Sequence, residues 1–390
     1  MLTAFYAARL CTPLEVIADA CLLVGDGQIE AVGPRAAITP PAGARTVELG
    51  DVLVAPGLLD IHVHGGAGHD VMRADPEGRA AMERLMARHG VAAYLATTVS
   101  APLDATLESL EHLSSGIQAA EDGAGRARPL GIHLEGPFIS HIRRGAHPPE
   151  HLLAPTPALL DQMWHAAQGT VRLLTIAPEL PGAIETIARA RELGIRVSLG
   201  HSDADGAAAR AGIAAGATQA THTFNAMPPL DHRASNLLSV ALSDPRLMAE
   251  LICDGIHVEP EVAAVFLRAK GPEGAILVTD GISATGMPPG RYRLGGFEVE
   301  VRDGRAMINE KTLAGSVLTL DRAVRNAATF AAWPLAGALR LATHNPAQAM
   351  GWPRRGRLVA GAAADFIVLD SAGPEPGTVR RTYIGGRDAS

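Results

Sequence analysis

The stretch LDIHVHGGAG, residues 59–68, places His62 and His64 one residue apart, at the end of an apolar run and directly before a glycine-rich turn. Side chains alternate between the two faces of a strand, so both imidazoles are expected to point the same way. A bound metal ion would account for such a pair. Chance would also account for it, because the chain has 15 histidines. The rest of the sequence has to discriminate between these two possibilities.

This apolar run is the first of eight, and Ala-rich stretches of helical composition lie between them, such as 76–89, 183–193 and 207–215. The runs are 58–62, 93–99, 131–135, 172–177, 196–200, 219–224, 250–253 and 276–279. Eight strands alternating with helices predict a (β/α)8 barrel of the α/β class. A doubly wound sheet would alternate in the same way, but its Gly-rich phosphate-binding motif is missing after the first run.

The two ends of the chain have the texture of short strands joined by tight turns. Residues 22–24 meet the turn Gly25-Asp26-Gly27, which is typical of a hairpin. Residues 365–370 and 383–384 repeat this pattern near the C-terminus. We therefore expect one small β-sandwich domain built from segments 1–54 and 353–390, attached to a barrel of residues 55–352.

Composition narrows the class of protein. The 390 residues are 47% hydrophobic but only 4% aromatic, so the core must be mostly aliphatic. A net charge of −7 without a run of Lys or Arg argues against a nucleic-acid partner. The three cysteines, Cys11, Cys21 and Cys253, lack metal-ligand spacing and suggest reduced thiols in a cytoplasmic protein. Neither an export signal nor an 18-residue apolar span is present, so no membrane association is expected.

Side chains that bind metals recur at the ends of the predicted strands, which meet on one face of a barrel. They are His62, His64, Glu135, His201, His222 and Asp280. A single histidine at a strand end is more often structural, but six such groups on five strands are hard to account for without a site. Imidazole and carboxylate suit zinc or ferrous iron. With an activated water and a nearby carboxylate, they predict metal-assisted hydrolysis of an amide or related bond.

Several motifs carry a resemblance to a known family. LDIHVHG, HLEGPF, GHSDA, THTFNAMPPLDHR, DGIHV, VTDGISATGMPPGRYRLGG and LAGSVLTL together resemble the N-acetylglucosamine-6-phosphate deacetylases of the amidohydrolase superfamily, over nearly the whole chain. The resemblance implies a metal-dependent hydrolase of amino-sugar metabolism that releases acetate and glucosamine 6-phosphate. HxH is shared across the superfamily, whereas LEGPF, NAMPPL and ATGMPPGRYRLGG are more specific to the deacetylases.

The family pattern implies a role for each metal-type residue. Glu135, His201 and His222 look like the core ligands, and His62 and His64 would complete a second site. The expected cofactor is one or two divalent ions, zinc or iron. In the alternative, one site is occupied and the histidine pair is hydrogen-bonded nearby.

The resemblance also implies catalytic and substrate-binding residues. Asp280 looks like the general base that later protonates the departing amine. His147 looks like the histidine that polarises the carbonyl, although a surface loop histidine is the alternative. The implied substrate contacts are Ala146, His147, Asn225, Ala226, Arg233, Asp254, Gly255, Ile256, His257, Leu313, Ala314 and Gly315. Among them, Arg233 and His257 match the phosphate contacts, and the family arginine reaches across a homodimer into the neighbouring site.

Because of two departures from the family pattern, the sequence predicts the type of reaction more firmly than the identity of the sugar. Residues 234–240 replace the usual Glu-Pro-Gly after Arg233, and residues 281–283 differ after Asp280. An isomer such as N-acetylgalactosamine 6-phosphate is therefore the main alternative substrate. A cyclic-amide or dipeptide hydrolase is disfavoured, because neither Lys270 nor Lys311 sits at a strand end where a metal-bridging lysine would lie. A non-enzymatic scaffold is disfavoured because all six metal-type groups are intact.

Overall fold

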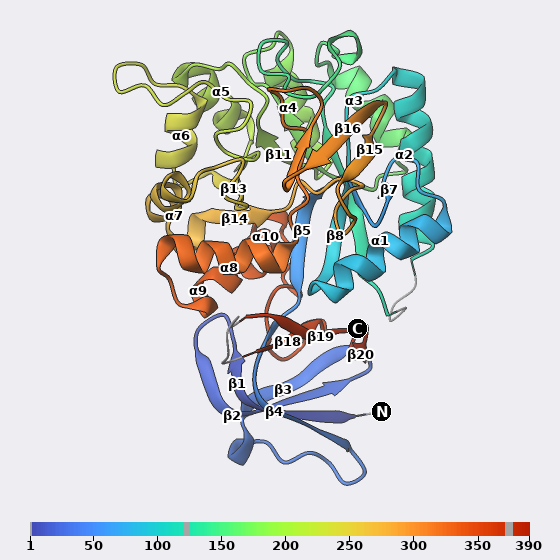
Figure 1. The fold of residues 1–390 in the computed structure, drawn as a ribbon, viewed down its shortest axis with the longest axis vertical. Coiled ribbons are helices and arrows are strands. Elements are labelled where there is room, and N and C mark those ends of the chain that lie inside the picture. The colour runs from blue at the N-terminus through green and yellow to red at the C-terminus, as the bar shows by residue number, and fades with distance from the viewer. Residues whose placement is uncertain (1, 121–124, 371–376) are drawn as a thin grey trace.

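The computed structural model describes residues 2–120, 125–370 and 377–390. It has two parts stacked along the long axis, a barrel surrounded by helices and a small β-domain below it (Figure 1). Both ends of the chain lie in the small domain (Figure 1). This arrangement confirms the predicted fold class. The boundaries at 54/55 and 352/353 stay predictions.

Eight parallel strands form the barrel, in the order β14-β13-β12-β11-β10-β9-β8-β5. They are β5 (Leu58–Val63), β8 (Val91–Thr98), β9 (Arg128–Glu135), β10 (Val171–Ile176), β11 (Arg196–Leu199), β12 (Gln219–Ala220), β13 (Met248–Ile252) and β14 (Ala275–Val278). Hydrogen bonds just beyond β14 close the circle, since the Asp280 amide donates to the His62 carbonyl over 2.9 Å and the His64 amide donates to the Gly281 carbonyl over 2.8 Å. Each strand lies at one of the predicted apolar runs, and β5 and β8 are buried throughout.

Ten α-helices of the described residues follow or flank these strands. They are α1 (Pro76–Arg88), α2 (Leu103–Gln118), α3 (Pro157–Ala166), α4 (Ala183–Glu192), α5 (Gly206–Ala215), α6 (Leu237–Ser243), α7 (Pro260–Gly274), α8 (Leu320–Ala331), α9 (Leu335–Leu341) and α10 (His344–Met350). Short side chains fix where several begin. Asp75 accepts a hydrogen bond from the Gly78 amide at the start of α1, and Thr156 accepts one from the Leu159 amide at the start of α3. Proline follows each of these caps, where its missing amide proton costs nothing.

The small domain joins strands from both ends of the chain into one sheet, in the order β20-β19-β18-β4-β1-β2-β3. Its strands are β1 (Thr3–Cys11), β2 (Val16–Gly25), β3 (Gln28–Pro34), β4 (Arg45–Pro56), β18 (Phe366–Asp370), β19 (Val379–Ile384) and β20 (Arg387–Asp388). The two halves pack on each other, since the ring of Phe5 lies 5.0 Å from that of Phe366 and 5.1 Å from that of Tyr383. The β-sandwich built from the two ends is thus confirmed.

A small antiparallel sheet was not predicted. It consists of β15 (Gly290–Leu294), β16 (Phe297–Arg302) and β17 (Arg305–Met307), and a two-stranded ribbon of β6 (Gly65–Gly66) and β7 (His69–Asp70) lies between β5 and α1. The two are connected, because the Gly295 amide donates to Asp70 Oδ2 over 2.7 Å. The Ser283 hydroxyl donates to the Arg293 carbonyl, so the segment that differs from the family pattern after Asp280 holds this sheet in place.

The described cysteines Cys11, Cys21 and Cys253 are buried free thiols. No helix in the described ranges has the length and apolar character that crossing a bilayer requires.

Candidate active site

Glu135, the last residue of β9, is the centre of the predicted cluster. Its Oε1 lies 3.1 Å from His201 Nε2 and 3.0 Å from His222 Nε2, and these two ring nitrogens are 3.0 Å apart. His62 Nε2 lies 3.3 Å from the same oxygen, while His64 Nε2 lies 3.1 Å from Oε2. The barrel therefore brings all five expected metal ligands together, and all are buried.

Asp280 lies on the other side of the histidine pair. Its Oδ1 is 3.1 Å from His64 Nε2 and 3.6 Å from His62 Nε2. Burial alone would raise the pKa of this carboxyl, but the charges of His62 and His64 and the hydrogen bond from His64 outweigh it and lower the pKa. Asp280 is therefore ionised at neutral pH and able to accept a proton.

His147 has a defined tautomer. The Ser100 amide donates to its Nδ1 over 3.2 Å, and the Ser100 hydroxyl lies 2.9 Å from the same atom. Burial, the largest influence, lowers the pKa of this imidazole to about 4. A neutral ring that accepts at Nδ1 must carry its proton on Nε2, which lies 3.5 Å from Glu135 Oε2. His147 thus directs an N–H into the cluster and is buried, not on the surface.

Three site residues have a left-handed backbone that side chains other than glycine rarely adopt. His201 has φ 48°, His222 has φ 24° and Asp280 has φ 49°. Each lies two residues beyond the end of its strand, β11, β12 or β14. Such strain persists where the surroundings over-determine the conformation, and it concentrates at functional sites. In this protein the left-handed backbone occurs where the three side chains turn toward the cluster around Glu135.

The donor set fits a divalent cation. His201 Nδ1 lies 3.0 Å from the Arg143 carbonyl and His64 Nδ1 lies 3.0 Å from the Thr97 carbonyl, so each ring donates there and leaves the Nε2 lone pair facing the cluster. His62 Nε2 is buried without a hydrogen-bond partner. Two groups of three within the described residues have the spacing of metal ligands, namely His62, His64, Asp280 and Glu135, His147, His201.

Protons and a cation compete for these nitrogens. Burial opposes a charge on His64, but the carboxylates of Asp280 and Glu135 outweigh it and raise the pKa of this imidazole to about 9. The same two carboxylates raise the pKa of His62 against the opposing effect of burial. The carboxylates of Asp280 and Glu135 therefore stabilise positive charge beside His62 and His64, which is the electrostatic requirement for a metal site.

Glu250, in β13, is a site residue that sequence reasoning missed. Its Oε2 lies 3.2 Å from His62 Nδ1 and accepts a hydrogen bond from the His222 amide, also over 3.2 Å. It therefore orients one expected ligand from each of two strands. The available signal was a carboxylate inside the buried apolar run 250–253, where a charge is costly unless it is paired.

A cavity of about 250 Å³ opens above the cluster. The implied substrate contacts that line it are Ala146, His147, Asn225, Ala226, His257, Leu313 and Gly315. Six lining residues were not anticipated, namely Val99, Gly145, Leu294, Phe297, Lys311 and Thr312. Leu294 and Phe297 come from β15 and β16, so the unpredicted small sheet forms one wall of this cavity.

The other implied contacts lie outside the cavity lining. Asp254 accepts hydrogen bonds from His257 Nδ1 over 2.7 Å and from the Ile256 and His257 amides over 2.8 Å each, so it orients His257. Gly255 belongs to the same turn, and Ala314 is buried. Arg233 is exposed in the segment between β12 and α6, which projects from the barrel beside α5 and α6 (Figure 1).

Comparison with known proteins agrees with this geometry. The amidohydrolase family profile matches residues 53–388. An N-acetylgalactosamine-6-phosphate deacetylase from Escherichia coli O157:H7 is 37% identical over 366 residues, which are 94% of both chains. An N-acetylglucosamine-6-phosphate deacetylase from Bos taurus is 39% identical over 352 residues, covering 87% of this chain and 84% of that one.

Solved structures give the same result. An N-acetyl-D-glucosamine-6-phosphate deacetylase mutant from Mycobacterium smegmatis, in complex with N-acetyl-D-glucosamine-6-phosphate, matches with a TM-score of 0.91 and 35% identity, covering 100% of this chain and 99% of that one. The enzyme from Thermotoga maritima matches with a TM-score of 0.86 and 30% identity over 98% of both chains. This chain therefore belongs to the amidohydrolase family and, within it, to the N-acetylglucosamine-6-phosphate deacetylases.

Proposed function

We propose that this protein hydrolyses the acetamide of N-acetylglucosamine 6-phosphate, releasing acetate and glucosamine 6-phosphate. The observation that carries the proposal is the placement of an ionised carboxylate, Asp280, and a neutral N–H donor, His147, around the cluster centred on Glu135. The amidohydrolase family is metal-dependent, and the ligand chemistry favours zinc or ferrous iron. We propose one or two ions per chain.

Glu135, His201 and His222 would hold a divalent cation, which would supply the Lewis acidity that polarises a carbonyl and makes water more acidic. Asp280 takes the proton from the attacking water at Oδ1 and delivers it to the amine nitrogen as the C–N bond breaks. His147 donates from Nε2 to the acetyl oxygen, where negative charge develops. His62 and His64 hold Asp280 in place and complete a second cation site.

The phosphate of the substrate requires positive charge at the far end of the cavity. Outside the metal cluster, two side chains of the described lining can donate hydrogen bonds to the phosphate, the ammonium of Lys311 and the imidazole of His257. We propose that Arg233 adds a third from a second copy of the chain, because it is exposed and does not line the cavity of its own chain. A homodimer is therefore part of the proposal.

One observation favours a second substrate. The Escherichia coli relative with 37% identity over 94% of both chains is an N-acetylgalactosamine-6-phosphate deacetylase. The two sugars differ at a single hydroxyl, and the same cluster hydrolyses either acetamide. N-Acetylgalactosamine 6-phosphate is therefore the alternative substrate.

Acetate release from metal-analysed protein tests the proposal, with four substrates compared: both sugar phosphates, unphosphorylated N-acetylglucosamine and an N-acetyl dipeptide. We expect the highest kcat/KM for N-acetylglucosamine 6-phosphate. A preference for the galactose isomer selects the alternative, and no acetate from either phosphate rejects both.

The cytoplasmic location stays a prediction, which cell fractionation tests.

A further inference from the structure

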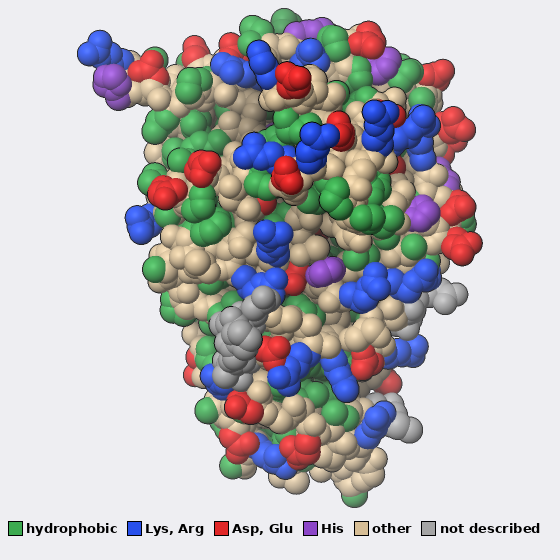
Figure 2. Space-filling model, viewed as in Figure 1, with side chains coloured by type: hydrophobic (Ala, Val, Ile, Leu, Met, Phe, Trp, Pro, Cys, Tyr) green, Lys and Arg blue, Asp and Glu red, His purple; other side chains and the backbone are tan. Residues whose placement is uncertain are grey.

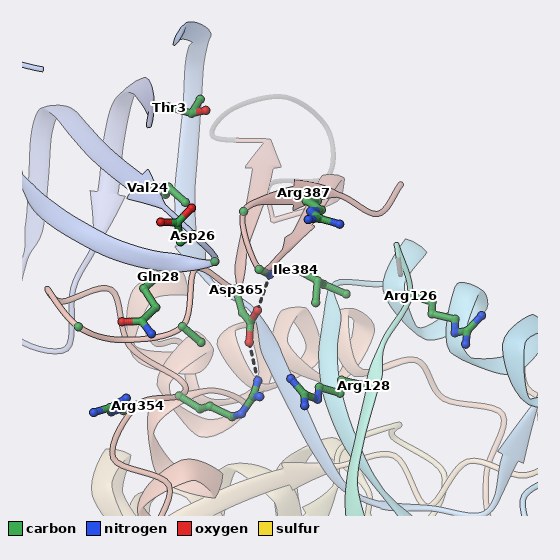
Figure 3. A pocket seen from close by; sticks show the side chains of 16 residues that line it. Thr3, Val24, Asp26, Gln28, Arg126, Arg128, Arg354, Asp365, Ile384 and Arg387 are labelled. Carbon is green, nitrogen blue, oxygen red and sulfur yellow. Dashed lines mark hydrogen bonds and ion pairs between the residues drawn. The ribbon is translucent and has the colours of Figure 1, made fainter. Parts of the chain in front are cut away.

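A second, larger cavity lies at the opposite end of the barrel from the active site. Its volume is about 670 Å³, against about 250 Å³ for the active-site cavity. Strand β9 spans the two, since Arg128 at its start lines the second cavity and Glu135 at its end belongs to the active site. Thr3, Val24 and Gln28 of the small domain form the facing wall (Figure 3). The cavity is therefore a cleft between the two domains, which we call the interdomain cleft.

Five arginines line the interdomain cleft, together with only two acidic side chains, Asp26 and Asp365. The arginines are Arg126, Arg128, Arg354, Arg355 and Arg387. Figure 3 shows Asp365 near the centre, with Asp26, Arg128 and Arg387 around it. In Figure 2, cationic side chains also gather along the junction of the two domains on the face that is presented. The cleft thus concentrates positive charge in a chain whose net charge is −7.

Internal ion pairs neutralise part of this charge. Arg355 lies 2.6 Å from Asp365, and Arg126 lies 2.8 Å from Glu83. Arg354 and Arg387 make no ion pair within ranges 2–120, 125–370 and 377–390. Both side chains are exposed, one on the segment after α10 and the other on β20. Two guanidinium groups, both from segment 353–390 of the small domain, therefore remain available to an anion.

The arginines also repel one another. Burial, and after it the charge of Arg355, lowers the pKa of Arg128 against the opposing charge of Asp365, although an arginine remains protonated in proteins. Like charges at close range destabilise the folded state unless an anion compensates them, and Asp365 supplies one negative charge among these arginines. An anion in the cleft would add to this compensation.

The walls of the cleft limit the kind of anion. Gly361 and Gly385 line it with positive φ and open space beside them, whereas a Cβ at Gly386 would meet Val24 Cγ1 at 2.6 Å. A Cβ at Gly361 or Gly385 would meet no atom within 4 Å. No aromatic ring occurs in the described lining, so a nucleotide base would find no stacking partner. The walls favour a compact, highly charged molecule without a base.

We propose that the interdomain cleft binds a small molecule with two phosphate groups, of the sugar bisphosphate class. Arginine forks bind phosphate oxygens in pairs, and Arg354 and Arg387 supply two forks from separate segments of the small domain, the stretch after α10 and β20. Binding stabilises the folded chain by mass action. This site is independent of the deacetylase cluster and does not rest on the proposed function.

Fructose 1,6-bisphosphate is the probe, measured by calorimetry and by the shift in melting temperature of the whole protein. We expect saturable binding to the wild type and a raised Tm. In Arg354→Ala/Arg387→Ala, binding should be roughly tenfold weaker or more, since two charge-assisted contacts are lost. Arg84→Ala/Arg268→Ala is the matched control, because it removes two exposed helical arginines outside both cavities and should bind as the wild type does.

Two competition arms distinguish binding in the cleft from binding in the active site and from recognition of a nucleotide. Saturating glucosamine 6-phosphate, a ligand for the active site, should leave bisphosphate binding unchanged, and ATP should bind no more tightly than the bisphosphate. The proposal is overturned by the absence of saturable binding to the wild type, by equal binding to the cleft variant, or by full competition from glucosamine 6-phosphate. Tighter binding of ATP overturns the assignment of the ligand class.

Discussion

Asp280 combines a buried carboxylate with a left-handed backbone and two neighbouring imidazoles. In Asp280→Asn the amide keeps the shape of the side chain but cannot accept a proton. We expect kcat to fall by about 10²–10⁴-fold, the range typical of a lost acid–base catalyst, with metal content and folding retained. Steady-state kinetics with metal analysis measures both quantities. Asp104→Asn, a change in the first turn of α2, is the control. Near-normal turnover in Asp280→Asn would remove this residue from the mechanism.

Lys311 is one of only two lysines in the chain and lines the active-site cavity. Lys311→Met keeps the length of the side chain and removes its charge. We expect KM for the phosphorylated substrate to rise by roughly tenfold with kcat little changed, because one charge-assisted contact to phosphate is lost. Lys311→Arg should restore most of the affinity. An equal effect on unphosphorylated N-acetylglucosamine would show that this lysine does not recognise the phosphate.

At the scale of elements, we expect the end of β5 to set how many ions the site holds, because His62 lies in this strand and His64 follows it. His62→Asn/His64→Asn removes two ring nitrogens but leaves Glu135, His201 and His222 in place. We expect the ion content per chain to fall by one, as measured by elemental analysis after dialysis. His141→Asn/His232→Asn, at exposed positions, is the control. Unchanged stoichiometry would support the alternative of a single occupied site with a hydrogen-bonded histidine pair.

The residue at the end of the same strand, His64, also predicts how metal binding depends on pH. The raised pKa of His64, about 9, means that a cation must displace a proton at neutral pH. Affinity for the second ion should therefore increase as the pH rises from about 7 to about 9, with proton uptake by the buffer on binding. Metal titrations in buffers of different ionisation enthalpy measure this effect. An affinity independent of pH would mean that His64 is already neutral.

The sequence predicted those elements whose pattern lies within one short stretch of residues, and it did not predict contacts between distant stretches. Every barrel strand was found, because each is a short buried run, and strand ends in a barrel converge whatever their distance along the chain. The sheet β15–β17 was missed although FEVEVR alternates strictly and Asp303-Gly304 has positive φ at both residues, as a hairpin turn requires. Glu250 could be noticed as a carboxylate in the apolar run 250–253, but its partner could not be predicted, since His62 lies 188 residues away.

At the scale of the whole molecule, the proposed dimer predicts complementation between two defective variants. Arg233→Ala lacks the reaching arginine and Asp280→Asn lacks the base, so each homodimer should be impaired. In a mixed dimer, one site combines the intact Asp280 of one chain with the intact Arg233 of the other. An equal mixture should therefore recover about a quarter of wild-type activity if subunits exchange freely.

Activity and subunit mass after co-expression measure this recovery. Arg246→Ala, at an exposed position in a local pair with Asp244, replaces Arg233→Ala as the control and should need no partner for activity. If the mixture recovers no activity although mixed dimers form, Arg233 acts within its own chain or not at all.

The position of β18 between β4 and β19 has a consequence for the nascent chain on the ribosome. Strand β4 pairs with β1 on one side and with β18 on the other, so its second edge stays open until residues 366–370 have been translated. During that interval the whole barrel is synthesised and can fold, while half of the small domain presents an unpaired strand to other chains. Mutations that delay barrel closure should therefore lower the yield of soluble protein by lengthening this exposure, and co-expressed chaperones should restore it.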